Sequence, residues 1–265
     1  GKVAVFVALA FVLLFCSAGA LEQVLFRRPV EIQLGAHLYY ENLSLSEAEA
    51  KLDAMKDAGL SWVRMELSED IDRLGALLTY AKGLGMNTIV ICREFSESKA
   101  RALAVRFGSK VDYYQLGNEI DHARPPWSTT LPYMEDEILT LLGKVRDAIL
   151  EYDPDAKFIV TFTLKFAERP TLVQRASPLA DVVGLDVYTW EGLATLSASL
   201  KLLKVLCGGK PVWITEFGAI ENQQAYIQAC IRRFRQEKIP VALIFAWNHE
   251  WYGVEKWFDA KNMGA

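Results

Sequence analysis

Short apolar runs rich in β-branched and aromatic residues alternate along this chain with stretches whose apolar positions recur at helical spacing. The pattern predicts eight strands, at residues 32–39, 61–67, 87–92, 113–119, 157–163, 182–188, 211–216 and 241–247. It predicts seven helices between them, at 46–58, 70–84, 97–107, 134–152, 171–175, 193–206 and 223–237. Strands that alternate with helices form parallel βαβ units.

Local signals support several of the predicted helix ends. Ser46, with Glu49 three residues later, has the pattern of a capping box, which predicts the start of the first helix there. Gly59, Gly85 and Gly108 follow the first three helices, and glycine commonly ends a helix.

The spacing of the strand ends predicts the architecture. Successive ends are about 26 to 31 residues apart, with one interval of about 43 across the long segment 122–132. Eight such units match a single (β/α)8 barrel, an α/β fold of about 250 residues. Few residues follow Trp251, so the last helix, near 254–259, is expected to be short or truncated. An open doubly wound sheet is the alternative, but residues 35–37 lack the further glycines of a dinucleotide-binding turn.

Composition and charge exclude other classes of protein. A hydrophobic content of 52% and a charged content of 23% are typical of an ordinary globular domain. The formal net charge of −4 does not favour binding to nucleic acid, and the basic residues at 232–235 are spaced as a solvated helix face. Cys92, Cys207 and Cys230 are too widely spaced for a zinc site or a disulfide framework and are expected to be buried thiols.

The first residues have the pattern of a secretory signal. An apolar run at 3–15 follows Lys2, and Ala18-Gly19-Ala20 fits a small-x-small cleavage site. We therefore expect residues 1–20 to be a signal peptide, 21–265 to be the catalytic domain, and the protein to be secreted. An uncleaved membrane anchor is the alternative, although the run is shorter than the ~20 residues that span a bilayer.

Two glutamates stand at predicted strand ends, Glu119 on the fourth strand and Glu216 on the seventh. The carboxyl ends of parallel barrel strands meet at one rim, where strands four and seven face each other. Two carboxylates about 5–5.5 Å apart suit retaining glycoside hydrolysis, one as nucleophile and the other as acid and then base. An ionised Glu216 would raise the pKa of Glu119 and keep its proton in place for the first step.

These motifs resemble those of the clan A glycoside hydrolases, barrels with the acid/base on strand four and the nucleophile on strand seven. Residues 116–119, Leu-Gly-Asn-Glu, resemble the Asn-Glu motif of that clan, and 214–218, Ile-Thr-Glu-Phe-Gly, resemble its nucleophile strand. The resemblance implies Glu119 as acid/base, Glu216 as nucleophile and Asn118 as the residue that binds the sugar 2-hydroxyl. The surroundings look closest to the cellulase- and mannanase-like members of family five, although Ile120 stands where those members commonly have proline.

The same resemblance implies roles for three further residues. Arg64 matches the strand-two arginine that bonds the nucleophile, and a fixed cation there would keep Glu216 ionised. Tyr188 matches the tyrosine that hydrogen-bonds the nucleophile, and Trp247 matches the tryptophan beneath the sugar.

Other residues are placed by the strand pattern. His37 ends the first strand and is expected to line the sugar site, while Trp213 has the opposite strand parity to Glu216 and is expected to face the helices. Four aromatic residues in predicted rim loops suit an open groove for a polysaccharide, or equally ordinary loop packing: Trp127, Trp190, Trp251 and Tyr252.

The leading hypothesis is a retaining β-glycoside hydrolase that needs no cofactor or metal and acts on a β-linked oligo- or polysaccharide. A carbohydrate-binding barrel without turnover is one alternative, suggested by the short last helix. A metal-dependent hydrolase is another, because His37, His122 and His249 fall near the rim and histidine is a zinc ligand. No His-x-His or His-Glu-x-x-His spacing supports it.

Overall fold

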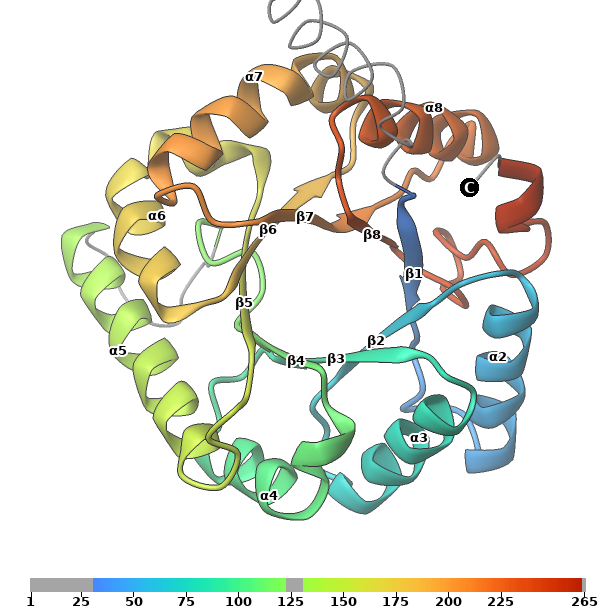
Figure 1. The fold of residues 1–265 in the computed structure, drawn as a ribbon, viewed down its shortest axis with the longest axis horizontal. Helices are drawn as coiled ribbons and strands as arrows, with labels where there is room; N and C mark the ends of the chain where they lie inside the picture. The colour runs from blue at the N-terminus through green and yellow to red at the C-terminus, as the bar shows by residue number, and fades with distance from the viewer. Residues whose placement is uncertain (1–30, 123–130, 264–265) are drawn as a thin grey trace, which may run out of the picture. The chain divides into compact units, whose positions relative to one another are not determined.

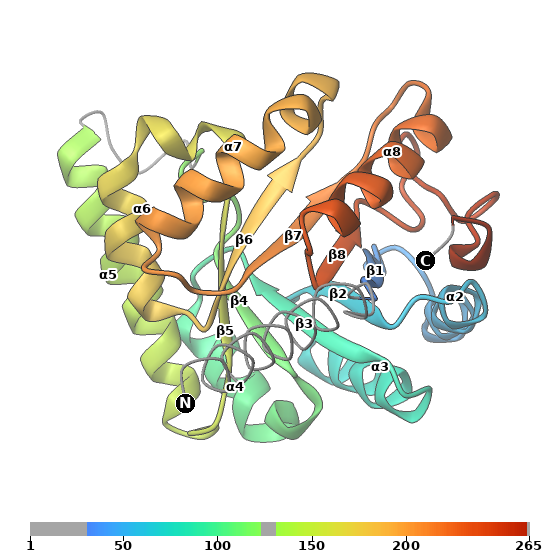
Figure 2. The ribbon, with the colours of Figure 1, turned by 45° about the horizontal axis from the view of Figure 1, so that its top comes forward.

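The computed structural model describes residues 31–122 and 131–263, in which eight parallel strands form a closed barrel. The strands are β1 (Gln33–His37), β2 (Trp62–Glu66), β3 (Asn87–Cys92), β4 (Tyr113–Leu116), β5 (Phe158–Phe162), β6 (Val182–Val187), β7 (Val212–Phe217) and β8 (Val241–Ile244). The helices are α2 (Leu45–Asp57), α3 (Ile71–Gly83), α4 (Glu97–Phe107), α5 (Leu131–Leu150), α6 (Pro170–Ala176), α7 (Trp190–Leu206) and α8 (Gln223–Gln236). The helices lie outside the ring of strands (Figure 1 and Figure 2). The predicted (β/α)8 barrel is confirmed.

The segment after β8 takes the place of an eighth helix. It ends in the short 3-10 helix η4 (Ala260–Met263), which lies between α8 and α2 in the ring (Figure 1). Phe258 packs edge-on against Trp247 with ring centroids 6.5 Å apart. The Ala260 N–H donates to the Ala58 carbonyl at 2.9 Å, at the end of α2. The expectation of a short last helix is confirmed.

The capping box of α2 lies two residues before its predicted position. Glu47 donates its backbone N–H to the Ser44 hydroxyl at 3.2 Å, and its carboxylate accepts from the Ser44 backbone N–H at 2.7 Å. The prediction of Ser46 as the cap was therefore wrong. Ser44 with Glu47 and Ser46 with Glu49 have the same Ser-x-x-Glu pattern, so the motif alone did not distinguish the two registers.

Several predictions concern residues that the structure does not describe. The signal peptide predicted for 1–20, Trp127 and most of the segment 122–132 lie outside the described residues. Among the helices that are described, none combines the length and the apolar character needed to cross a bilayer. The thiols of Cys92, Cys207 and Cys230 are free and buried, as predicted.

Near the amino ends of the strands, the barrel interior is an apolar layer that includes Trp213. Its indole ring contacts Trp62 and Tyr113 edge-on, with ring centroids 5.2 and 4.8 Å apart. The prediction that Trp213 faces the helices was wrong, because β7 is irregular. Leu185 on β6 pairs with Ile214, but the next residue pairs with Glu216, so β7 carries one extra residue at this point. The irregularity reverses the alternation, and both Trp213 and Glu216 face the barrel interior.

Gly184 on β6 makes room for a hydroxyl group above this apolar layer. A Cβ at Gly184 would lie 2.3 Å from the Thr215 Oγ1 and 2.8 Å from the Thr161 side chain. The absence of a side chain therefore lets the Thr215 hydroxyl reach across to Asp186 Oδ1, to which it donates at 2.6 Å.

We expect Gly184→Ala to lower the free energy of unfolding by about 1–3 kcal/mol, because the new methyl group must displace closely packed atoms. Urea denaturation measures this change. Gly143→Ala is the matched control, since a Cβ at Gly143 in α5 meets nothing within 4 Å. That variant should be neutral or more stable by up to about 1 kcal/mol, because alanine favours the helix. Equal stability of the two variants would contradict the packing argument.

Candidate active site

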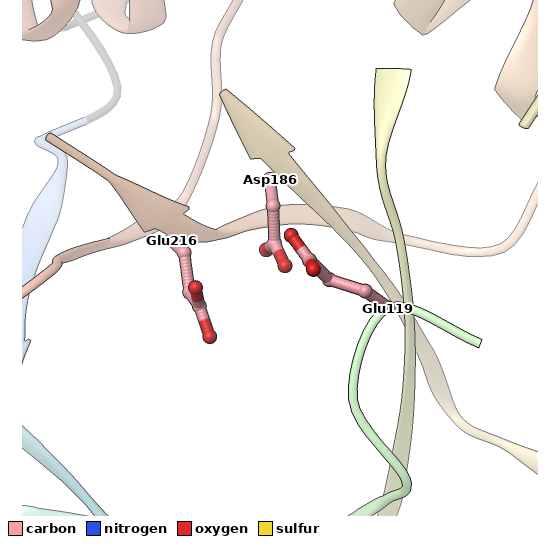
Figure 3. Close-up of side chains that lie close together, drawn as sticks. All are labelled: Glu119, Asp186 and Glu216. Atoms are coloured by element: carbon pink, nitrogen blue, oxygen red, sulfur yellow. The ribbon is translucent and has the colours of Figure 1, made fainter. Parts of the chain in front are cut away.

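Three carboxylates converge at the rim formed by the carboxyl ends of the strands. They belong to Glu119 just after β4, Asp186 on β6 and Glu216 on β7 (Figure 3). One oxygen atom of each lies within 4.8 Å of the others. Asp186 and Glu216 are only 2% and 3% exposed, whereas Glu119 is partly exposed. The two glutamates predicted from the sequence therefore lie close together, and the buried Asp186 lies beside them.

Glu216 is held by one cation and one hydroxyl group. The Arg64 guanidinium pairs with Glu216 Oε1 at 2.6 Å, and the Tyr188 hydroxyl donates to Glu216 Oε2. Arg64 is fully buried and also donates to Gln115 Oε1 and Asn118 Oδ1, each at 2.7 Å. Because these two hydrogen bonds anchor Arg64, its guanidinium fixes the position of the Glu216 carboxylate and compensates its charge.

Glu119 is presented by a tight turn after β4. Its backbone lies in the left-handed region with φ +46°, two residues after Gly117 with φ +71°, and its N–H donates to the Thr161 hydroxyl at 2.9 Å. Burial raises the pKa of Glu119 to about 7, with further contributions from the negative charges of Glu216 and Asp121. About half of the Glu119 carboxyl groups are therefore expected to hold a proton at pH 7, and more at lower pH.

Asp186 was missed by the sequence analysis. Its Oδ1 accepts from Thr215, and its Oδ2 is buried without a partner among the residues that the structure describes. Burial raises the pKa of Asp186 well above its ordinary value, and the charge of Glu216 raises it further. A signal for it exists in the sequence, because Asp186 stands two residues before Tyr188 in an apolar strand and so shares its face.

Asn118 and His37 lie close to the Arg64 guanidinium. Asn118 Oδ1 accepts from Arg64 and, at 2.9 Å, from the Gln115 amide. The His37 Nδ1 lies 3.5 Å from Arg64 Nη1, and its ring contacts Tyr39 edge-on at 4.4 Å. Burial, together with the positive charge of Arg64, lowers the pKa of His37 well below its ordinary value. His37 is therefore a neutral group in the floor of the site.

The two tryptophans predicted to contact sugar lie in different environments. Trp247 is 1% exposed, so its ring offers almost no surface, and its role beneath a sugar stays a prediction. Trp190 is 51% exposed and lines a hollow of about 540 Å³. Tyr188, Tyr226 and Tyr252 line the same hollow, and the Tyr188 hydroxyl also donates to Glu216, so Tyr188 borders both the hollow and the carboxylate site.

Aromatic residues after β1 and β8 form the other side of the rim. Phe245 and His249 contact the Tyr39 ring at 5.8 and 5.3 Å. Asn248 fixes this side, because its amide accepts from the Tyr39 N–H at 3.0 Å and donates to the Tyr39 carbonyl at 2.7 Å. Sequence analysis assigned no role to Tyr39, Phe245 or Asn248. Phe245 directly follows β8, whereas Tyr39 and Asn248 lie in the loops that follow β1 and β8.

The three carboxylates are also the one group, within the described parts of the chain, whose spacing would suit a metal ion. However, both Glu216 oxygens already have partners, Arg64 and Tyr188. A buried guanidinium beside the carboxylate also opposes a second cation. The donor set therefore favours proton transfer over metal binding at this rim.

The fold is similar to that of several solved structures. A Rhizomucor miehei β-1,3-glucanosyltransferase mutant in complex with laminaritriose matches with a TM-score of 0.65 and 17% identity, over 86% of this chain and 92% of that one. A family 1 β-glucosidase from Thermotoga maritima matches with a TM-score of 0.62 and 14% identity, over 86% and 91%. A Bacteroides uniformis β-glucuronidase matches with a TM-score of 0.64 and 16% identity, over 83% of this chain and 31% of that one.

This chain therefore spans about a third of the length of the glucuronidase. No family model matches the sequence, and no curated protein matches it either. The low identities limit the likeness to the fold. At that level, the barrel expected from the clan A resemblance is confirmed.

We expect Arg64→Met to lower the free energy of unfolding by about 3–5 kcal/mol at pH 8, because it leaves Glu216 as a buried charge without its cation. The loss should be smaller at pH 5, since a carboxylate without its cation takes up a proton more readily and then carries no charge. Urea denaturation at both pH values measures the difference.

Arg93→Met is the control for this experiment. Arg93 pairs with Glu66 at 2.8 Å, but its side chain is 49% exposed, so its loss should cost about 0–1 kcal/mol. Equal losses for the two arginine variants would show that the buried ion pair contributes no more to the free energy of unfolding than the exposed one.

Proposed function

We propose that this protein is a retaining β-glycoside hydrolase, with Glu119 as acid/base and Glu216 as nucleophile. The observation that carries this proposal is the unequal environment of the two carboxyl groups. Glu216 is paired with the buried Arg64 cation and a tyrosine hydroxyl. Glu119 has a pKa raised to about 7, mainly by burial. One ionised and one protonated carboxyl are what the two steps of the reaction require.

In the first step, Glu216 attacks the anomeric carbon and forms an ester, while Glu119 gives its proton to the departing glycosidic oxygen. Esterification removes the charge of Glu216, and this removes one cause of the raised pKa of Glu119. In the second step, the Glu119 carboxylate takes a proton from water, which attacks the anomeric carbon and releases Glu216. The oxygen spacing of at most 4.8 Å supports this reaction over inversion, which needs a gap of about 6.5–9.5 Å.

The hollow beside Tyr188 supports an extended substrate. Trp190 and Tyr252 line it with aromatic surface, which suits the apolar faces of sugar rings. We therefore propose a β-linked oligo- or polysaccharide as substrate. Three of the similar structures are a β-1,3-glucanosyltransferase, a β-glucosidase and an endo-β-1,4-mannanase, so both glucans and mannans belong in a substrate screen. We further propose that residues 1–20 direct the enzyme out of the cell, because of their apolar run and small-residue site.

The test begins with a screen of aryl β-glycosides, β-glucans, β-mannans and galactans for released product. Glu216→Ala should then reduce hydrolysis by at least about 10⁴-fold, since it removes the nucleophile. Azide should restore turnover of an activated aryl glycoside and give a glycosyl azide of inverted configuration. Glu119→Ala should instead give an azide product of retained configuration. Undiminished activity of Glu216→Ala would exclude its role as nucleophile.

Glu151→Ala is a matched control for these variants. The side chain of Glu151 is 52% exposed and pairs with Arg101, which is 43% exposed, so the substitution should leave activity unchanged. Binding to an insoluble polysaccharide with no released reducing sugar would favour a non-catalytic barrel. Loss of activity with a chelator would favour a metal-dependent hydrolase.

The pH profile tests the role of Glu119. We expect kcat/KM to fall above about pH 7, approaching tenfold per pH unit, because the free enzyme must hold a proton on Glu119. Asp121→Asn removes one of the negative charges that raise this pKa, so the alkaline limb should move to lower pH. An alkaline limb that stays in place in Glu119→Gln would assign it to another group.

A further inference from the structure

Asp186 is a third carboxyl group within a site whose reaction uses two. It lies on β6, is 2% exposed, and Figure 3 shows the Glu119 carboxyl directed toward it. The charged and titratable groups that act on Asp186 come from three other strand regions, namely Arg64 on β2, Glu119 after β4 and Glu216 on β7. Tyr188, directly after β6, is another titratable neighbour, and the Thr215 hydroxyl is the hydrogen-bond donor to Asp186.

The charges in this group leave Asp186 without a cation of its own. Arg64 is the one cation among these neighbours, and its guanidinium is already engaged by Glu216, Gln115 and Asn118. An ionised Asp186 would be a second buried negative charge with no compensation, which is strongly unfavourable. Burial accordingly raises the pKa of Asp186 well above its ordinary value.

The hydrogen bonds of Asp186 indicate which oxygen holds the proton. Oδ1 accepts from the Thr215 hydroxyl at 2.6 Å, as the carbonyl oxygen of a carboxylic acid would. Oδ2 is buried and has no partner among the described residues, so it is the oxygen left to carry the proton. One Asp186 oxygen lies within 4.8 Å of an oxygen of Glu119. The proposed hydrogen bond requires the two carboxyl groups to turn toward each other.

We propose that Asp186 is a positioning residue that keeps a proton on Oδ2 and donates it in a hydrogen bond to the Glu119 carboxylate. This inference rests on the proposed role of Glu119. The bond forms when Glu119 has given its proton to the leaving group, and it holds the other Glu119 oxygen toward the water. No proton leaves Asp186, so the proton balance of the two hydrolytic steps is unchanged. Thr215 orients Asp186, and Gly184 provides the space for Thr215.

The first test is independent of any activity. An unfolded aspartate loses its proton above about pH 4, whereas a folded Asp186 would keep it, so the wild type should lose stability as pH rises. Asp186→Asn has no such proton. The unfolding equilibrium constant of the wild type, relative to Asp186→Asn, should therefore rise about tenfold per pH unit between pH 5 and 7. The exposed Asp155→Asn should show no such slope. A flat ratio for Asp186→Asn would overturn the proposal.

A second measurement applies if Asp186→Asn does not fold. Carboxyl ¹³C labelling of aspartate in the wild type should show one resonance at the position of a protonated acid at pH 7. Ionised resonances for all aspartates would overturn the proposal.

The kinetic test separates positioning from charge. Asparagine accepts from Thr215 and donates to Glu119, so Asp186→Asn should keep kcat within about threefold and leave the alkaline limb in place. Asp186→Leu removes both bonds and should lower kcat by about 10- to 100-fold with little change in KM. If Asp186 were ionised, Asp186→Asn would move the limb to lower pH, which would overturn the proposal. A protein without hydrolytic activity fails the proposed function, but the stability and resonance measurements still decide the protonation of Asp186.

Discussion

The buried ion pair between Arg64 and Glu216 is the contact on which the arrangement of the rim depends. One guanidinium has three carboxyl groups around it, and it pairs directly with one of them. Because a charge in a low-dielectric interior needs a partner, the unpaired carboxyls of Glu119 and Asp186 favour their protonated forms. Because Arg64 pairs with Glu216 alone, Glu216 stays a carboxylate, whereas Glu119 and Asp186 favour the acid form, although the three side chains have nearly the same chemistry.

A local irregularity of β7 sets up this arrangement. The extra residue at this point allows Trp213 below it and Glu216 above it to face the same interior. The barrel interior is thus apolar around Trp213 and polar at the rim. On β7 the change from apolar to polar occurs between Trp213 and Glu216. Strand alternation read from a sequence assumes a regular pleat, so it assigned Trp213 to the wrong side.

The barrel and the order of its strands could be predicted from sequence because they depend on local periodicity and on regular spacing. The predicted fourth and eighth strands were too long, since β4 ends at Leu116 and β8 at Ile244, but Glu119 and Glu216 do meet at one rim. The rest depends on contacts between distant segments. Asp186 stands in an apolar strand, two residues before Tyr188. This spacing predicts that the two side chains share one face of the strand, but the sequence analysis did not use it. Trp247 is buried and packs against Phe258 from the segment after β8, and no periodicity encodes that contact.

The closure of the barrel by β8 against β1 has a consequence for the synthesis of the chain. Their loops are tied together by the paired hydrogen bonds of Tyr39 and Asn248, which are 209 residues apart in sequence. During translation, the edge of β1 that pairs with β8 therefore stays unpaired until β8 has emerged from the ribosome. Such edges are the preferred points of aggregation, and contacts of this sequence separation form slowly. The nascent protein is then most vulnerable to aggregation before β8 leaves the ribosome.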